Sequence, residues 1–198
     1  KIFVIHGGLD FVNEKSFCAE MWKIYSKVDA IVAPSRHAAR NLKGLCGIDS
    51  RIIQHGVDLE LFNPFTVSKH NARKRLKIDP DALVILWNAR MDPLKGLHSL
   101  IRALPRTNAI KDFKILLFIK TRTLNNKYYQ YILSLIRKAG LDKNVIIDKS
   151  WTPINHMLVF YRATDIYVNT SYTEAFGSLT MLEAMACGIP VVARNASS

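Results

Sequence analysis

Residues 166–193, IYVNTSYTEAFGSLTMLEAMACGIPVVA, combine two short strand-like runs with one helical stretch. The runs at 166–169 and 191–193 are rich in β-branched and aromatic residues, whereas residues 179–187 repeat apolar side chains at helical spacing. Gly188 follows the helical pattern as a C-cap residue. A strand, a helix and a second strand in this order predict two parallel strands joined by a right-handed crossover.

The same alternation of strand and helix continues outward along the chain. It predicts the α/β class, with parallel sheets flanked by helices and with ligands bound at the carboxyl ends of the strands. A polar segment at residues 63–77 separates an earlier α/β unit from a later one. The remaining expected strands are residues 2–5, 30–32, 51–54, 83–87, 114–119 and 145–148, and the remaining expected helices are residues 14–27, 38–43, 96–104, 126–139 and 154–162.

The composition is that of an ordinary folded chain. Its 198 residues are 49% hydrophobic and 22% charged, which suits one large domain or one domain with part of another. Both ends interrupt the α/β pattern, so we expect a fragment. No apolar run approaches the roughly 20 residues that span a bilayer, and no signal peptide is recognisable, so we expect a cytoplasmic chain. The odd number of cysteines predicts that Cys18, Cys46 and Cys187 are reduced core residues.

The formal charge of +12 allows nucleic acid, anionic lipid and phosphorylated ligands as partners. The densest basic run, residues 69–77 (KHNARKRLK), either faces anionic lipid or nucleic acid as a basic helix or forms a solvated helix face. We favour the solvated face. A nucleic-acid-binding chain would interleave clustered basic residues with exposed aromatic ones, and this single run disfavours nucleic acid as a partner.

A pair of cations follows the strand expected at residues 83–87. In residues 87–96 (WNARMDPLKG), the loop carries Arg90 and Lys95 before a helix begins. A guanidinium grips phosphate oxygens through two parallel hydrogen bonds, and an ammonium adds a compact charge, so the pair suits a diphosphate. The alternative is two solvated loop charges.

A second candidate site follows the strand expected at residues 166–169. Gly177 permits close approach of the backbone, and the helix after it presents free N–H groups and a partial positive charge, which together suit a phosphate. Glu183, in the first turns of that helix, can accept hydrogen bonds from both hydroxyls of a ribose, and Glu174 would lie nearer the sugar. The alternative makes Glu174 a loop charge and Glu183 a helix-surface residue.

Taken together, these residues resemble the glycosyltransferases of group one, also called family four. The resemblance extends over nearly the whole chain, and it implies GT-B architecture, in which two Rossmann-like domains with parallel sheets face each other and hold the donor in their cleft. The matching segments are residues 55–58 (HGVD) with Phe62 and Pro64, residues 90–96, residues 165–171 and, most specifically, residues 174–192.

The resemblance also implies a domain division. Residues 1–62 would be the C-terminal part of the N-terminal, acceptor-side domain, which is therefore incomplete. Residues 63–198 would be the nucleotide-sugar-binding domain, truncated before its last segment. Family members transfer sugars with retention and without a metal, so no metal ligands and no cofactor are expected, and the donor is a UDP-, GDP- or ADP-sugar.

By the same resemblance, eight residues acquire roles at the donor site. The residues that would act on the diphosphate and the transferred sugar are Arg90, Lys95, Glu174 and His6. The residues that would bind the nucleotide are Gly177, Ser178, Leu179 and Glu183.

The implied mechanism needs no protein nucleophile. Charge grows on the departing diphosphate while the acceptor hydroxyl attacks from the same face, so cations and helix dipoles stabilise the transition state. His6 resembles the histidine with which the amino-terminal domain reaches the donor sugar across the cleft. The alternative for His6 is a polar residue that closes a buried strand.

Two departures from the family pattern bear on the site. The family usually spaces its two glutamates eight apart, whereas Glu174 and Glu183 are nine apart. An extra residue before the helix would leave Glu183 on its face, and one within the helix would turn it by about 100°. We favour the loop. Ala89 and residues 119–122 (IKTR) replace positions at which the family often has glycine, so unusual contacts to the donor base are expected.

The leading prediction is a retaining glycosyltransferase that moves a sugar from a nucleotide-diphosphate sugar to a hydroxyl acceptor. The acceptor would be a sugar, a lipid-linked compound or a glycan, in the assembly of a glycolipid or polysaccharide. One alternative is another GT-B enzyme, such as a sugar-nucleotide epimerase or a phosphorylase. The other is a non-catalytic module that binds nucleotide sugar or docks on a membrane, and peripheral contact with the anionic cytoplasmic face of a membrane is kept as an alternative.

Overall fold

The computed structural model describes residues 1–4, 14–107, 115–121, 125–174 and 178–195. The described chain forms two compact units, the first comprising Lys1–Gly56 with Thr173–Leu179 and the second comprising Val57–Tyr172 with Thr180–Asn195. The division into domains after residue 62 stays a prediction. Within the described residues, no helix has the length and apolar character needed to cross a bilayer.

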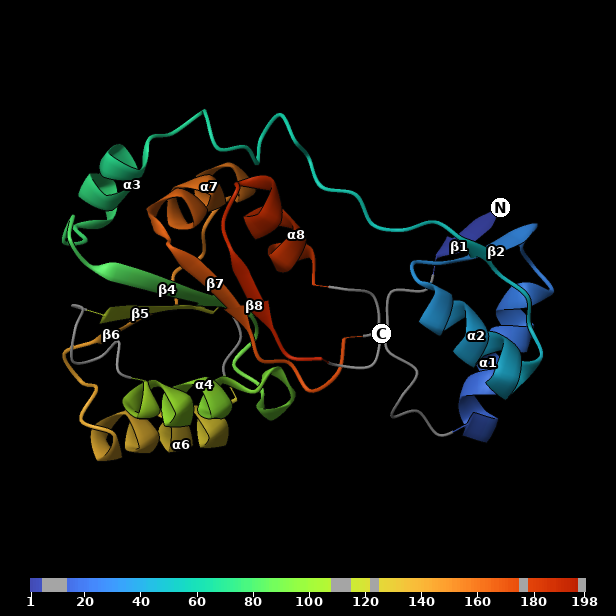
Figure 1. Cartoon of the computed structure of the whole chain (residues 1–198). Helices are drawn as coiled ribbons and strands as arrows, with labels where there is room; N and C mark the ends of the chain where they lie inside the picture. Colours follow the sequence, from blue (N-terminus) through green and yellow to red (C-terminus); the bar gives the residue numbers. More distant parts are fainter. Residues whose placement is uncertain (5–13, 108–114, 122–124, 175–177, 196–198) are drawn as a thin grey trace. The chain divides into compact units, whose positions relative to one another are not determined.

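The first unit contains a three-stranded parallel sheet, whose strands run from blue to teal in Figure 1. The sequence order of its strands is also their spatial order, and Ile31 of the central strand lies opposite Phe3. Its strands are β1 (Ile2–Val4), β2 (Ala30–Ala33) and β3 (Arg51–Ile52), and its helices are α1 (Glu14–Tyr25) and α2 (Arg36–Cys46).

The two helices of the first unit are joined by a disulfide between Cys18 of α1 and Cys46 of α2. The prediction that all three cysteines are reduced is therefore wrong for this pair. Packing of α1 on α2 brings the two Cα atoms to 5.1 Å, which is within the range that a disulfide spans, although 28 residues separate them in the sequence. Cys187 is free and buried, as predicted.

The second unit contains a five-stranded, fully parallel sheet in the order β6-β5-β4-β7-β8. Numbered from its first strand, this is the order 3-2-1-4-5 of doubly wound sheets, and it confirms the predicted α/β class. The chain leaves β4 in one direction and returns to its other side with β7, so the switch in strand order lies between β4 and β7. The strands are β4 (Leu83–Asn88), β5 (Ile115–Lys120), β6 (Val145–Asp148), β7 (Ile166–Asn169) and β8 (Val191–Ala193).

Helices cover both faces of this sheet because its strands are apolar on both sides. Val84 and Leu86 of β4 pack into one core, and Ile85 and Trp87 pack into the other. Figure 1 shows α3, α7 and α8 above the sheet and α4 and α6 below it. These helices are α3 (Lys69–Leu76), α4 (Leu97–Ala103), α6 (Asn126–Lys138), α7 (Ile154–Ala163) and α8 (Leu179–Ala186), with short 3-10 turns η1 (Pro93–Lys95) and η2 (Leu104–Arg106).

An ion pair joins α3 to the sheet. Arg73 is only 5% exposed, and its guanidinium donates to Asp165 at 2.5 Å and to the carbonyl of Ala163 at 3.1 Å. Asp165 also accepts from the backbone N–H of Val84 at 2.7 Å and pairs with Lys69. The predicted solvated face of residues 69–77 is therefore wrong for Arg73, because this side chain satisfies buried oxygens at the start of β4 and β7.

Candidate functional site

The candidate site lies at the carboxyl ends of β4 and β7, where the strand order of the second unit switches. In open parallel sheets of this kind, ligands bind in the crevice beyond the strand ends at the switch point. β4 ends at Asn88 and β7 ends at Asn169, so the loops that follow these two residues form the edge of the site.

These two loops are fixed to each other by hydrogen bonds. The indole Nε1 of Trp87 donates to the hydroxyl of Thr170 at 3.1 Å, and that hydroxyl donates to the carbonyl of Lys95 at 2.9 Å. The backbone N–H of Tyr172 donates to the carbonyl of Leu94 at 2.8 Å. The loop after β4 therefore lies directly on the loop after β7.

A tight turn presents the two predicted phosphate ligands. Asp92 accepts from the backbone N–H of Leu94 at 2.8 Å and thereby caps η1. Arg90 precedes this turn and is exposed, and Lys95 ends it and is half-buried. The structure thus places both cations on one short loop after β4, as the sequence predicted, while their role in binding phosphate stays a prediction.

Gly96 closes the turn with a left-handed backbone, at φ 69°. A Cβ on this residue would lie 2.2 Å from the carbonyl oxygen of Thr170 and 3.1 Å from the ring of Tyr172. Only glycine allows both this φ and this approach, so Gly96 is what lets the turn reach the loop after β7.

Glu183 of α8 is held to the end of β4 through Tyr161 of α7. The amide of Asn88 donates to the Tyr161 hydroxyl at 3.2 Å, and that hydroxyl donates to a Glu183 carboxylate oxygen at 2.5 Å. Burial raises the pKa of Glu183, and the Tyr161 hydroxyl opposes this increase. Burial and the Glu183 charge raise the pKa of Tyr161, which therefore keeps its proton and stays the donor.

The beginning of α8 is tied to the same strand end. The hydroxyls of Thr180 and Tyr167 each lie 3.2 Å from the carbonyl oxygen of Asn88, and one of them donates to the other across 2.6 Å. Thr180 and Glu183 are three residues apart and share one face of α8. α8 is continuous over Leu179–Ala186, and residues 175–177 before it lie outside the described residues, so the placement of the extra residue in the loop stays a prediction.

Planar side chains stack on Tyr172, which lies in the loop after β7. The ring of Tyr172 stacks on His98 with centroids 5.6 Å apart, and the Arg194 guanidinium lies 3.9 Å from the Tyr172 centroid. The Tyr172 hydroxyl lies 2.9 Å from the Ser99 hydroxyl and 3.0 Å from His98 Nε2. Burial, then the charges of Arg102 and Arg194, lower the pKa of His98, so its neutral form is favoured.

A cavity of about 400 Å³ adjoins this stack, lined by residues that include Ser99, Asn169 and Arg194. Sequence reasoning did not identify the stack or the Tyr161–Asn88 pair. Tyr161 reads as a core residue of an apolar helix, and Arg194 follows the last expected strand without any motif. Only the folded sheet brings these residues to the strand ends.

Two of the remaining predicted site residues, Glu174 and Ser178, belong to the first compact unit. Leu179 is the first residue of α8, the helix that carries Glu183, although the boundary between the two units follows it. His6 and Gly177 lie outside the described residues. Within the described ranges, no group of three histidine, cysteine or acidic side chains could hold a metal ion. The proposed roles of Glu174, Ser178, Leu179, His6 and Gly177 at the donor site stay predictions.

The sequence model of the family described as glycosyl transferases group 1 matches residues 68–198. Similar sequences include the D-inositol 3-phosphate glycosyltransferase of Segniliparus rotundus, which is 30% identical over 174 residues, covering 86% of this chain and 38% of that protein. A protein of the same name, numbered 2, from Catenulispora acidiphila is 32% identical over 181 residues, covering 86% and 41%. The chain thus spans about two fifths of the length of these relatives.

Solved structures share the fold. Anabaena Alr3699/HepE in complex with UDP-glucose superposes with a TM-score of 0.83 over 98% of this chain and 53% of its own, at 20% identity. A glycosyltransferase from Rickettsia africae has a TM-score of 0.80 at 23% identity, over 98% and 51%. The C-terminal domain of a glycosyl transferase group 1 family protein from Francisella tularensis has a TM-score of 0.60 at 27% identity, over 70% of each chain.

Substitution of Gly96 tests the docking of the two loops. Gly96→Ala should lower the free energy of unfolding by more than about 2 kcal/mol, because the methyl group meets the Thr170 carbonyl in addition to the cost of positive φ. Gly140 has φ 66°, and a Cβ added to it would meet nothing within 4 Å, so Gly140→Ala is the matched control and should cost about 1 kcal/mol. Urea unfolding measures both losses, and equal losses would contradict the close approach.

The raised pKa of Glu183 predicts that its negative charge destabilises the folded chain at neutral pH. Because its folded pKa lies above the ordinary 4.5, the stability that the protonated group contributes is complete below that value and is lost as the pH rises through the folded pKa. Glu183→Gln should therefore raise the thermal unfolding midpoint at pH 7 and leave it nearly unchanged at pH 4. The exposed Glu60 supplies the control, and an equal gain from Glu60→Gln at pH 7 would show that net charge, not burial, is responsible.

Proposed function

The chain belongs to the group 1 glycosyl transferases, and on this premise we propose that it is the nucleotide-sugar-binding part of a retaining sugar transferase. The longer protein would transfer a sugar from a nucleotide-diphosphate sugar to a hydroxyl of a sugar, lipid-linked or glycan acceptor. One observation carries the proposal: the turn with Arg90 and Lys95 follows Asn88 directly, and the same Asn88 is linked through the Tyr161 hydroxyl to Glu183.

The diphosphate is proposed to bind the turn after β4. The exposed Arg90 guanidinium can donate two parallel hydrogen bonds to phosphate oxygens, and Lys95 adds a second positive charge on the same turn. The bonds of Thr170 and the capping by Asp92 fix this turn before any ligand arrives. A fixed cationic turn loses little conformational entropy on binding, which favours affinity.

The ribose is proposed to bind Glu183. A carboxylate has about four acceptor positions, and Tyr161 uses one of them, which leaves room for two ribose hydroxyl donors. Partial burial disfavours the charged form of Glu183 when no ligand is bound, and hydrogen bonds from two ribose hydroxyls would stabilise that charged form. Tyr161 thus orients the carboxylate while the nucleotide completes its hydrogen bonding.

Catalysis in the longer protein is proposed to rest on stabilisation of the departing diphosphate. Negative charge grows on the phosphate oxygens as the glycosidic bond breaks, and Arg90 and Lys95 would bind that state more strongly than the intact donor. Gly177, Ser178 and Leu179 would add backbone N–H groups at the start of α8.

The sugar would be placed by the two residues predicted to reach it, Glu174 and His6. The acceptor hydroxyl would then attack from the face that the diphosphate leaves, without a covalent intermediate and without a metal ion. A retained anomeric configuration in the product is the outcome that this scheme requires.

The donor nucleotide is proposed to be UDP, GDP or ADP, and the UDP and UDP-glucose complexes of HepE make UDP the first to test. The name of the curated relatives makes inositol 3-phosphate one acceptor to try with the longer protein. Sugar transfer by that protein would separate the proposal from a sugar-nucleotide epimerase, a phosphorylase or a non-catalytic binding module.

Calorimetric titration of the chain with UDP, GDP and ADP tests the nucleotide site. At least one should bind, and Arg90→Ala and Glu183→Ala should each weaken binding at least tenfold, because a charge-assisted hydrogen bond contributes about 1.5–3 kcal/mol and about 1.4 kcal/mol is tenfold. Arg106→Ala is the matched control, since Arg106 is an exposed arginine in η2, at the far end of α4 from the turn that carries Arg90. Unchanged affinity in the first two variants, or an equal loss in the control, would refute the site.

A further inference from the structure

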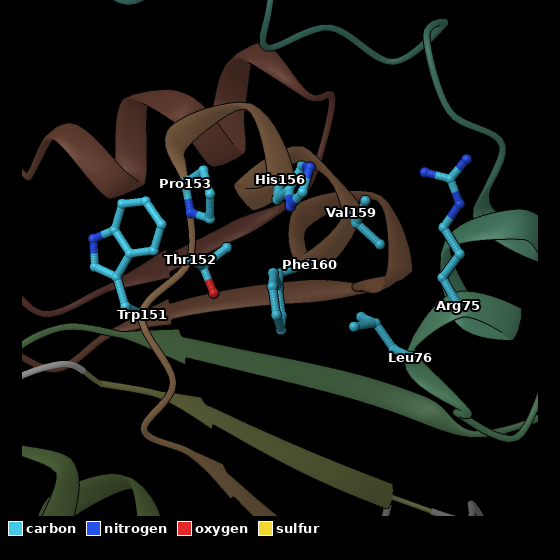
Figure 2. Close-up of a pocket in the computed structure, with 8 residues that line it drawn as sticks. All are labelled: Arg75, Leu76, Trp151, Thr152, Pro153, His156, Val159 and Phe160. Carbon is cyan, nitrogen blue, oxygen red and sulfur yellow. The ribbon is translucent and has the colours of Figure 1, made fainter.

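A groove of about 330 Å³ runs between α3, α7 and the segment that joins β6 to α7. Figure 2 shows the ring of Phe160 within it, with Trp151 and Arg75 at opposite ends. Leu76, Pro153 and Val159 supply further apolar walls. None of these residues belongs to the proposed nucleotide site, so the groove needs its own explanation.

Two large apolar side chains at this end of α7 are exposed to solvent. Trp151, which lines the groove, is 66% exposed, and Ile154, the residue after the lining Pro153, is 64% exposed, although the helix that begins at Ile154 buries Leu158 and Phe160 in the core. Full burial of a side chain of this size stabilises a folded protein by roughly 1.5–3 kcal/mol, and the exposed Trp151 and Ile154 do not contribute this free energy to folding. Tryptophan in particular is enriched where a protein meets the headgroup region of a membrane.

The helices that border the groove carry only positive charge. Neither α3 nor α7 contains an acidic residue. Asp165 pairs with Lys69 and Arg73, which leaves Lys74 and Arg75 exposed on α3. The next cation along the chain, Lys77, is also exposed and precedes the two acidic residues of the turn to β4.

These charges act together on a nearby anion. An eight-residue helix is about 12 Å long, which is close to the Debye length of roughly 8–10 Å at physiological ionic strength. Arg75 lies in the groove itself, whereas Lys74 and Lys77 lie within a turn of it. A headgroup phosphate beside Arg75 would therefore be attracted by the positive charges of Arg75, Lys74 and Lys77 together.

We propose that the groove between α3 and α7 is a docking surface for anionic phospholipid at a membrane surface. Arg75, with Lys74 and Lys77, binds the headgroup phosphates, and Trp151 and Ile154 enter the boundary between headgroups and acyl chains. The apolar walls of the groove favour lipid over nucleic acid, because they offer few hydrogen-bonding groups to base edges. The surface is separate from the nucleotide site, so the proposal does not depend on glycosyl transfer.

Vesicle flotation of the 198-residue chain tests this surface, with phosphatidylcholine vesicles compared with vesicles that contain 30% phosphatidylglycerol. Binding should require the anionic lipid, and Arg75→Glu should reduce the bound fraction several-fold. Arg137→Glu is the matched control, because it makes the same charge change at an exposed position of α6 on the opposite face of the sheet. Arg137→Glu should keep binding within twofold of the unmodified chain.

Tryptophan fluorescence tests the apolar part of the surface. Anionic vesicles should shift the emission to the blue, and Trp151→Phe should abolish the shift, whereas Trp22→Phe, at an exposed position of the first unit, should retain it. An unchanged thermal unfolding midpoint establishes that the variants are folded. Equal losses in Arg75→Glu and Arg137→Glu, absence of binding to anionic vesicles, or binding to RNA in place of vesicles would overturn the proposal.

Discussion

The hydroxyl of Thr170 is the group on which the candidate site depends. It accepts from the indole of Trp87 and donates to the carbonyl of Lys95, so a single side chain joins the end of β4, the loop after β4 and the loop after β7. Loss of this hydroxyl would leave two partners without their hydrogen bond. The left-handed turn at Gly96 allows the loops to approach closely enough for these bonds, which hold the turn at Lys95.

Two chemically different surfaces lie at different places on the doubly wound sheet of the second unit. The carboxyl ends of β4 and β7 carry the cationic turn and the partly buried Glu183, which suit a nucleoside diphosphate. The α3 and α7 layer carries exposed apolar and basic side chains that suit a membrane surface. One basic run serves both the core and the surface, because Arg73 turns inward to Asp165 while Arg75 stays outside.

Much of the fold follows from local sequence patterns, since parallel strands buried on both faces read as apolar runs. The strand expected at residues 83–87 is observed as Leu83–Asn88. The disulfide between Cys18 and Cys46 could not be predicted, because only the packing of two helices brings the pair together. The support of Glu183 by Tyr161 was missed for the same reason: a tyrosine on an apolar helix face has no local sign of its hydroxyl's partner.

Hydrogen–deuterium exchange of the chain, with and without the nucleoside diphosphate that binds it, tests most directly whether the switch point holds the nucleotide. Bound nucleotide should slow exchange in residues 88–96 and 180–184, where the cationic turn and the Glu183 helix meet the end of β4. Exchange in α3 and α6, which contribute no residue to the proposed nucleotide site, should stay unchanged. Slowed exchange confined to α3 and α6, or to the amino ends of the strands, would contradict the assignment of the site.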